Sequence, residues 1–149
     1  MRFLASILSI PILLSACADA TPRQQSVTSA WVRLPAVAGN PAAGYFSLAG
    51  GSVSDRLMSV SSPLAVRAEL HDMTMAGGMM KMAEIKGGVE VAVGKPLDFA
   101  PGGKHVMLFD VSPQATAGRT MPLRFVFASG VEIEHAATIV AAGDAPPIP

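Results

Sequence analysis

Glycine and proline interrupt this chain so often that it has little room for long helices. Its 149 residues include 14 glycines and 12 prolines, and both residue types favour turns. Between them lie short runs in which apolar and polar residues alternate, as around Trp31, in Val89–Val93 and in Met121–Phe127, where Met121, Leu123, Phe125 and Phe127 share one face. Such alternation places the apolar side chains on one face of a strand. From roughly eight or nine such runs without a clear helical period we expect an all-β fold, an antiparallel β-sandwich, with a barrel as the alternative.

The composition indicates one folded domain. Half of the residues are hydrophobic and 15% are charged, which allows a real core and excludes disorder of the whole chain. Eleven basic residues balance eleven acidic ones, so the chain lacks the basic surface that nucleic-acid binding needs. A single cysteine excludes an intramolecular disulfide and a thiolate-rich zinc or iron–sulfur site.

The first 17 residues have the pattern of a bacterial lipoprotein signal peptide. Arg2 precedes an apolar stretch, Phe3–Leu14, that is too short to cross a bilayer. It ends in Leu14-Ser15-Ala16-Cys17, where the Cys17 thiol would be lipidated and become the first mature residue. The alternative is an ordinary secretory signal ending near Ala20, with Cys17 incidental. Both interpretations place the mature protein outside the cytoplasm, and the first makes it a periplasmic, membrane-anchored lipoprotein.

The rest of the chain divides into a tether, a domain and a tail. Residues 18–26 are polar and are expected to link the lipid anchor to the domain. The folded domain is expected to span residues 27–140. Residues 141–149 contain three prolines and a glycine, so we expect a disordered, extended tail.

Methionine is concentrated in one segment. Five of the nine methionines lie between Met73 and Met82, and His71 precedes them. A second segment, His105-Val106-Met107, follows a Gly-Gly turn. Residues i and i+2 of a strand share a face, so His105 and Met107 can reach one point. His71 is expected on the face opposite Leu70, and therefore away from the core.

Imidazole and thioether groups form a soft, uncharged ligand set that suits Cu(I). A blue-copper site needs a cysteine thiolate, and Cys17 lies outside the domain. Catalytic zinc needs a further histidine or carboxylate ligand, and no HExxH motif is present. We find no nucleophile–base pair or paired carboxylates, so an enzyme is not expected.

The residues alone leave one ligand open. Met73 is a candidate because His71-x-Met73 mirrors His105-x-Met107, although the glycines that follow would leave Met73 near a frayed strand end. Met82 is the other candidate, because it lies beyond a Gly77–Gly78 loop and on the next strand.

The remaining methionines and the third histidine are given other roles. Met73, Met75 and Met80 are possible auxiliary metal ligands. Met58 and Met121 are expected in the core, where methionine commonly fills gaps. His135 alternates in phase with apolar residues, so it is expected to be a partly buried strand residue without a ligand role.

The two segments together resemble the signature of the periplasmic copper chaperones of the PCu(A)C type. That signature is His, ten residues, Met, about twenty-one residues, then His-x-Met. Here ten residues separate His71 from Met82, and twenty-two separate Met82 from His105. The resemblance extends from Ala30 to about Val140. It implies a cupredoxin-like or immunoglobulin-like sandwich that binds one Cu(I) through a set of four ligands: His71, Met82, His105 and Met107.

The resemblance also implies a function. Family members are thought to deliver copper towards the binuclear copper centre of a cytochrome c oxidase subunit, often alongside a Sco-type thiol protein. Some carry a His- and Met-rich extension with a second copper site, but no His or Met follows Val140 here. Two alternatives remain: a copper-buffering or resistance lipoprotein with the same site, and a structural lipoprotein with no metal role.

Overall fold

The structure, a computed structural model, describes residues 22–147, so Cys17 and the predicted signal peptide lie outside the described residues. None of the residues described forms a helix long and apolar enough to cross a membrane. The described chain folds into strands joined by turns, which confirms the all-β prediction. The strands are β1 (Ser26–Arg33), β2 (Ala42–Ala49), β3 (Asp55–Ser61), β4 (Ala65–Ala76), β5 (Met79–Glu84), β6 (Val89–Val91), β7 (Pro96–Phe99), β8 (His105–Val111), β9 (Thr120–Phe127) and β10 (Glu132–Val140).

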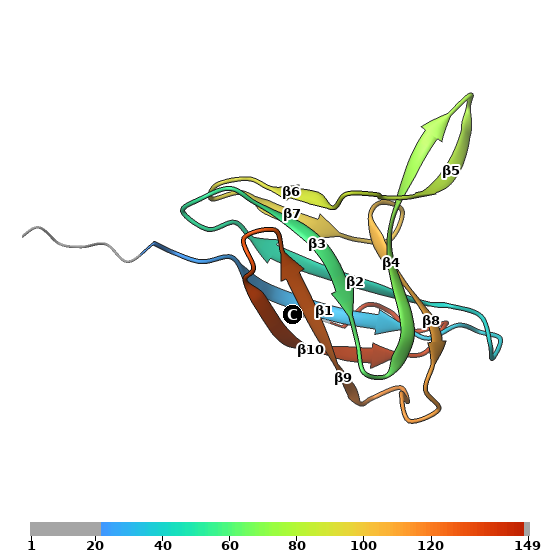
Figure 1. Ribbon diagram of the computed structural model, residues 1–149. Helices are drawn as coiled ribbons and strands as arrows, with labels where there is room; N and C mark the ends of the chain where they lie inside the picture. Colours follow the sequence, from blue (N-terminus) through green and yellow to red (C-terminus); the bar gives the residue numbers. More distant parts are fainter. Residues whose placement is uncertain (1–21, 148–149) are drawn as a thin grey trace, which may run out of the picture.

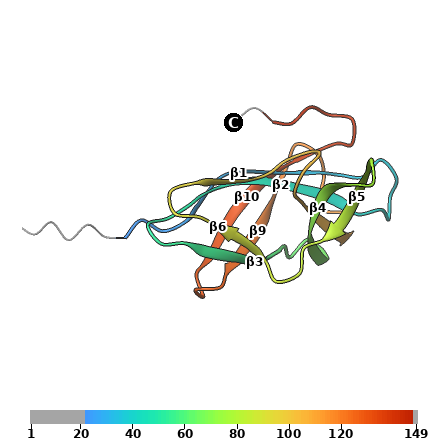
Figure 2. The same cartoon turned by 90° about the horizontal axis from the view of Figure 1, so that it is seen from above.

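The ten strands form one continuous sheet that curls over its own core. Hydrogen bonds connect them in the order β5-β4-β8-β2-β1-β10-β9-β3-β6, and β7 pairs with β2. In Figure 2, β1 and β2 lie on one side and β3 and β6 on the other. Phe46 of β2 meets Phe125 of β9 edge to face, with ring centroids 4.9 Å apart, although two other strands separate them in the sheet. Within residues 22–147 no ladder joins β5 or β4, at one end of this order, to β3 or β6 at the other, so the sheet does not close and the fold is a sandwich and not the alternative barrel.

One strand pair differs from the antiparallel expectation. β1 and β10 run parallel, with Trp31 opposite Thr138 and Arg33 opposite Val140. A parallel pair needs a long connection, and here the rest of the domain supplies it. The pairing joins the first and last strands of the domain, and it places their C-terminal ends, Arg33 and Val140, beside each other.

The core follows the alternation read from the sequence. Met121, Leu123 and Phe125 of β9 are fully buried, with polar or partly exposed residues between them. Met121 therefore lies in the core as predicted. The same prediction for Met58 is wrong, because its side chain is 43% exposed. The register of β3 against β9 shifts on either side of Met58, and such a bulge turns the extra residue out of the alternation.

Hydrogen bonds attach the segments at both ends of the domain to the sandwich, which the sequence does not indicate. Within the expected tether, the Arg23 N–H donates to the Ser52 hydroxyl, and the Ser52 N–H donates to the Arg23 carbonyl. Gly51 has to be glycine there, since a Cβ would lie 2.5 Å from the Arg23 carbonyl oxygen. Beyond β10, the expected extended tail instead turns at Ala141–Asp144, and Arg33 donates to the Asp144 carbonyl at 3.0 Å.

Asp55 joins three segments at one end of the sandwich. Its carboxylate accepts hydrogen bonds from the Ser129 hydroxyl at 2.5 Å, the Arg56 N–H at 2.7 Å and the Gln25 amide at 3.3 Å. Partial burial raises the pKa of Asp55, but the hydrogen bonds from Ser129 and Arg56 outweigh it and hold the pKa below its usual 3.8. This carboxylate therefore stabilises the fold in its charged form.

Candidate metal centre

The candidate site lies on one face of three neighbouring strands, β5, β4 and β8. His71 of β4 pairs directly with His105 of β8, and Met107 is two residues further along β8. Met82 of β5 pairs with Met73 of β4. Leu70 is buried in the core, so His71 points to the opposite face, as predicted from the alternation. Met107 shares the face of His105 for the same reason, and its side chain is half-buried.

His105 is held in one orientation by the turn that precedes it. Its side chain is only 7% exposed, and its Nδ1 lies 2.9 Å from the Gly103 carbonyl oxygen. A carbonyl can only accept, so Nδ1 carries the hydrogen and Nε2 of the neutral ring carries a lone pair. This backbone contact is the kind of outer hydrogen bond that fixes the tautomer of a metal-binding histidine.

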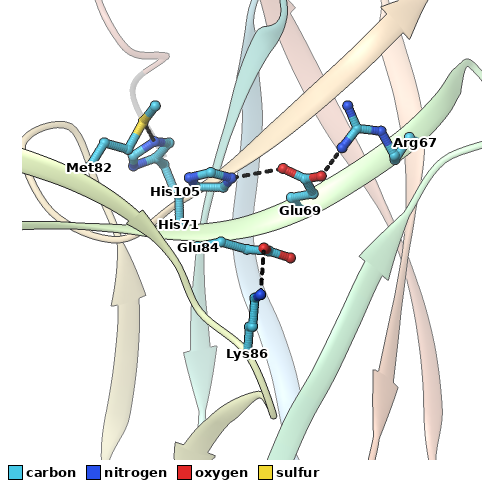
Figure 3. A network of polar contacts seen from close by, with 7 residues as sticks. All are labelled: Arg67, Glu69, His71, Met82, Glu84, Lys86 and His105. Carbon is cyan, nitrogen blue, oxygen red and sulfur yellow. Dashed lines mark hydrogen bonds and ion pairs between the residues drawn. The ribbon is translucent and has the colours of Figure 1, made fainter.

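The free nitrogen of His105 faces the sulfur of Met82. Nε2 and Sδ are 3.3 Å apart, and Figure 3 shows the Met82 thioether over the imidazole. Neither atom has a hydrogen to donate in this tautomer, so two lone pairs point at each other. Two ligands in tetrahedral geometry lie about 3.5 Å apart when the bonds are about 2.0 Å to nitrogen and 2.3 Å to sulfur, as at zinc. The pair is therefore already near the spacing that one shared ion requires.

His71 is oriented by a carboxylate. Its Nε2 lies 3.0 Å from Oε2 of Glu69, and Glu69 in turn pairs with Arg67 (Figure 3). The carboxylate accepts, so Nε2 carries the hydrogen and Nδ1 carries the lone pair. That Nδ1 is buried and has no hydrogen-bond partner among the described residues, which is uncommon for a buried polar atom. The two imidazole rings lie 5.8 Å apart, centroid to centroid, and each keeps one nitrogen free.

Contacts on the opposite face hold the strands in register. The Lys104 ammonium donates to the Asp72 carboxylate at 2.7 Å, and both side chains are about a third exposed or less. This pair joins the residue after His71 to the residue before His105. The Ile85 N–H donates to the Leu70 carbonyl at 2.7 Å and extends the pairing of the β4–β5 hairpin.

Met73 does not lie at a frayed strand end. β4 continues to Ala76, and Met73 sits inside the paired region opposite Met82. Met75 and Met80 form the next cross-strand pair towards the turn. Of these methionines, Met82 is the one whose sulfur lies within hydrogen-bond range of a histidine nitrogen among the described residues. The prediction that Met82 lies on the next strand is confirmed.

The hydrogen-bond partners of the two site histidines were missed by the sequence analysis. The contact of Glu69 with His71 could have been predicted from the sequence, because Glu69 is two residues before His71 and shares its face. No sequence pattern indicates the contact of His105 with the Gly103 carbonyl.

His135 lies on β10 beside Trp31 and Thr138, and it is partly buried as predicted. Within residues 22–147 no group of three or more His, Cys, Asp or Glu side chains could hold a metal ion.

The donor set is thus two imidazoles with free nitrogens and two thioethers on one face. None of these groups carries a negative charge, and thioethers prefer soft cations over Mg²⁺ or Ca²⁺. Thioethers carry no proton to lose, so the chemistry of this donor set suits a soft monovalent ion.

Solved structures share this fold. The copper-bound PCuAC domain from PmoF2 matches with a TM-score of 0.65 at 21% identity, covering 81% of this chain and 96% of that domain. The solution structure of CuI-DR1885 from Deinococcus radiodurans matches with a TM-score of 0.62 at 26% identity, covering 87% of this chain and 86% of the other. The fold is therefore the cupredoxin-like β-sandwich of PCuAC domains, and the family resemblance seen in the sequence is confirmed.

The family follows from the sequence comparisons. Residues 26–139 match the family described as "Putative lipoprotein LpqE-like". A protein of Leifsonia xyli subsp. xyli, described as "Putative lipoprotein Lxx21020", is 31% identical over an alignment of 114 residues that covers 74% of this chain and 68% of that protein. The chain belongs to the LpqE-like family.

Proposed function

We propose that this protein is an extracytoplasmic copper chaperone that binds one Cu(I) through His71, Met82, His105 and Met107. The observation that carries the proposal is the facing of His105 Nε2 and Met82 Sδ at 3.3 Å, beside a buried and unpartnered Nδ1 of His71. A cation between these atoms removes the repulsion of the facing lone pairs. Two similar solved structures are copper-bound forms, and one of them is a Cu(I) form.

The oxidation state follows from the ligands. Two thioethers and two imidazoles favour Cu(I), whereas Cu(II) prefers nitrogen and oxygen ligands in a tetragonal arrangement. We expect Cu(I) to bind tightly and Cu(II) much more weakly. The absence of a thiol from this ligand set also suits an oxidising compartment, where a free thiol would be converted to a disulfide.

The ligands differ in solvent exposure, and this difference supports a stepwise release of the copper ion. His105 is 7% exposed, whereas Met82 is 51% exposed and belongs to β5, an edge strand of the sheet. A recipient can therefore displace the Met82 thioether first, while the histidines still hold the ion. Stepwise displacement avoids a free ion at any stage.

The place of action is proposed from the N-terminal pattern and from the lipoprotein naming of the family. A lipid on Cys17 would hold the protein on the periplasmic side of a membrane. The recipient would then be a membrane-bound copper protein, with a cytochrome c oxidase subunit or a Sco-type thiol protein as the candidates.

A competition titration tests the binding. A coloured Cu(I) chelator competes with the purified full chain under anaerobic conditions, and the chelator should lose one equivalent of copper to the protein. His71→Asn should weaken the binding strongly, whereas His135→Asn, the matched change on β10, should leave it unaltered. Failure of the wild-type chain to compete would refute the proposal.

A transfer assay separates the chaperone from a copper buffer. The copper-loaded chain is mixed with a copper-free binuclear copper domain of cytochrome c oxidase or with a reduced Sco-type protein. Handover of the ion to either recipient supports the chaperone. Retention by the chain against both recipients would favour the buffering role.

A further inference from the structure

The hairpin of β4 and β5 stands away from the rest of the molecule (Figure 1). The ladder between β4 and β8 ends at His71 and His105, so within residues 22–147 β4 pairs only with β5 from Asp72 onward. The turn at the tip consists of Gly77 and Gly78, whose φ angles are +60° and +77°. Positive φ at both central residues is the two-residue hairpin turn that matches strand twist.

One face of this hairpin presents thioethers at two successive levels. Met75 pairs with Met80, and Met73 pairs with Met82. All four share the face of His71, because they lie an even number of residues from it or from its partner Glu84. The other face carries Thr74 opposite Lys81, so the ammonium group points away from the sulfur atoms.

Packing does not explain this arrangement. Met75 is 68% exposed and Met80 is 49% exposed. A two-stranded hairpin alone is marginal in water, and β-branched or aromatic residues would support it better than methionine. The sequence instead places flexible, polarisable thioethers where they contribute little to the core.

We propose that Met75 and Met80, with Met73, form a second and weaker Cu(I) site, through which copper enters and leaves the main site. This inference rests on the proposed function of that main site. Directly opposed side chains have Cβ atoms about 4.5–5.5 Å apart, and the flexible methionine side chain lets both sulfurs reach one ion. The site lacks imidazoles and is open to water, so it binds Cu(I) at least 100-fold more weakly than the main site.

The transfer step is a ligand exchange. Successive levels on the hairpin lie two residues apart, about 7 Å, and Met82 belongs both to the hairpin and to the main site. A new Cu–S bond forms to Met73 or Met82 as the bond to Met75 or Met80 breaks. Copper remains Cu(I), no electron moves, and no proton is released, because thioethers carry none.

The test follows the methionine methyl groups of the full chain by NMR during an anaerobic Cu(I) titration. The first equivalent should shift the Met82 and Met107 methyl signals, and the second should shift those of Met75 and Met80. In the double variant Met75→Leu/Met80→Leu the first equivalent should bind within threefold of wild type, the second should be lost, and release to a chelator should slow at least fivefold. Met79→Leu is the matched control, since Met79 is 64% exposed and lies on the other face.

The outcomes separate this inference from the proposed function. Binding of the first equivalent, with no shift of Met75 and Met80 at the second, would overturn the hairpin site and leave the main site intact. An unaltered second equivalent and release rate in the double variant would overturn it as well. Absence of any Cu(I) binding would overturn both proposals. Leucine is close to methionine in volume, and an unchanged Tm of the double variant would exclude a folding defect as the cause.

Discussion

Glu69→Gln removes the charge that orients His71 while keeping the size of the side chain. Glu69 accepts the Nε2 hydrogen of His71 at 3.0 Å and so leaves Nδ1 free for a metal. A glutamine amide can present its NH₂ group to the ring instead. The imidazole then favours the other tautomer, in which Nδ1 carries the hydrogen and cannot bind copper.

The expected loss follows from the contact. A hydrogen bond to a charged group contributes about 1.5–3 kcal/mol, and the His71 and Glu69 side chains are only 12% and 23% exposed, so solvent screens the contact little. Each 1.4 kcal/mol corresponds to about tenfold in affinity. We therefore expect Cu(I) affinity to fall about 10-fold to 100-fold, the range typical for outer partners of metal-binding histidines.

The chelator competition at neutral pH measures this change, and Glu84→Gln is its matched control. Glu84 lies directly opposite His71 on β5, and its carboxylate is near Lys86, at 4.0 Å. The control therefore removes the same charge beside the same histidine without altering the contact between His71 and Glu69. Equal affinities of the two variants would show that the orientation of His71 does not depend on Glu69, and the reasoning would be wrong.

In the same titration, Met82→Leu should weaken Cu(I) binding at least as much as Met107→Leu, and Met73→Leu should matter less; the reverse order would reassign the fourth ligand. Asp55→Asn should cost about 1 kcal/mol, which lowers the Tm by about 4 °C in thermal unfolding. Because the pKa of Asp55 is lowered in the fold, this stabilisation is complete above the unfolded value of about 3.8 and is lost as the pH falls through the folded pKa. The two melting temperatures should therefore converge in acid, and a constant difference would argue against the carboxylate. Cys17→Ser should move the protein from the membrane fraction to the soluble fraction, and a soluble wild-type protein would contradict the lipid anchor.

Local patterns predicted much of the fold and the main features of the site. The alternation in β9 predicted the buried face of Met121, Leu123 and Phe125, and the same rule placed His105 and Met107 on one face. These predictions succeed because the period of a strand depends only on neighbouring residues. They need no knowledge of which strands pair.

Other features depend on contacts that no local pattern contains. The Met-rich segment holds a single β-branched residue, Thr74, so the sequence predicts a loop at Gly77–Gly78 rather than the tight turn of a hairpin. The Met58 side chain lies outside the core because β3 has a bulge there against β9. Where a bulge occurs depends on the partner strand. The parallel pairing of β1 with β10 joins residues more than 100 positions apart, and it too depends on the assembled sheet.

The hydrogen bonds between Arg23 and Ser52 set how far the domain can travel from a membrane. With Cys17 lipidated as proposed, only six residue steps join the acylated residue to a backbone fixed on the domain. A chain of that length spans at most about 20 Å when fully extended. The protein would then search for its recipient across the bilayer surface and not through the depth of the periplasm. A partner's copper site would have to lie within about one domain's height of the lipid headgroups.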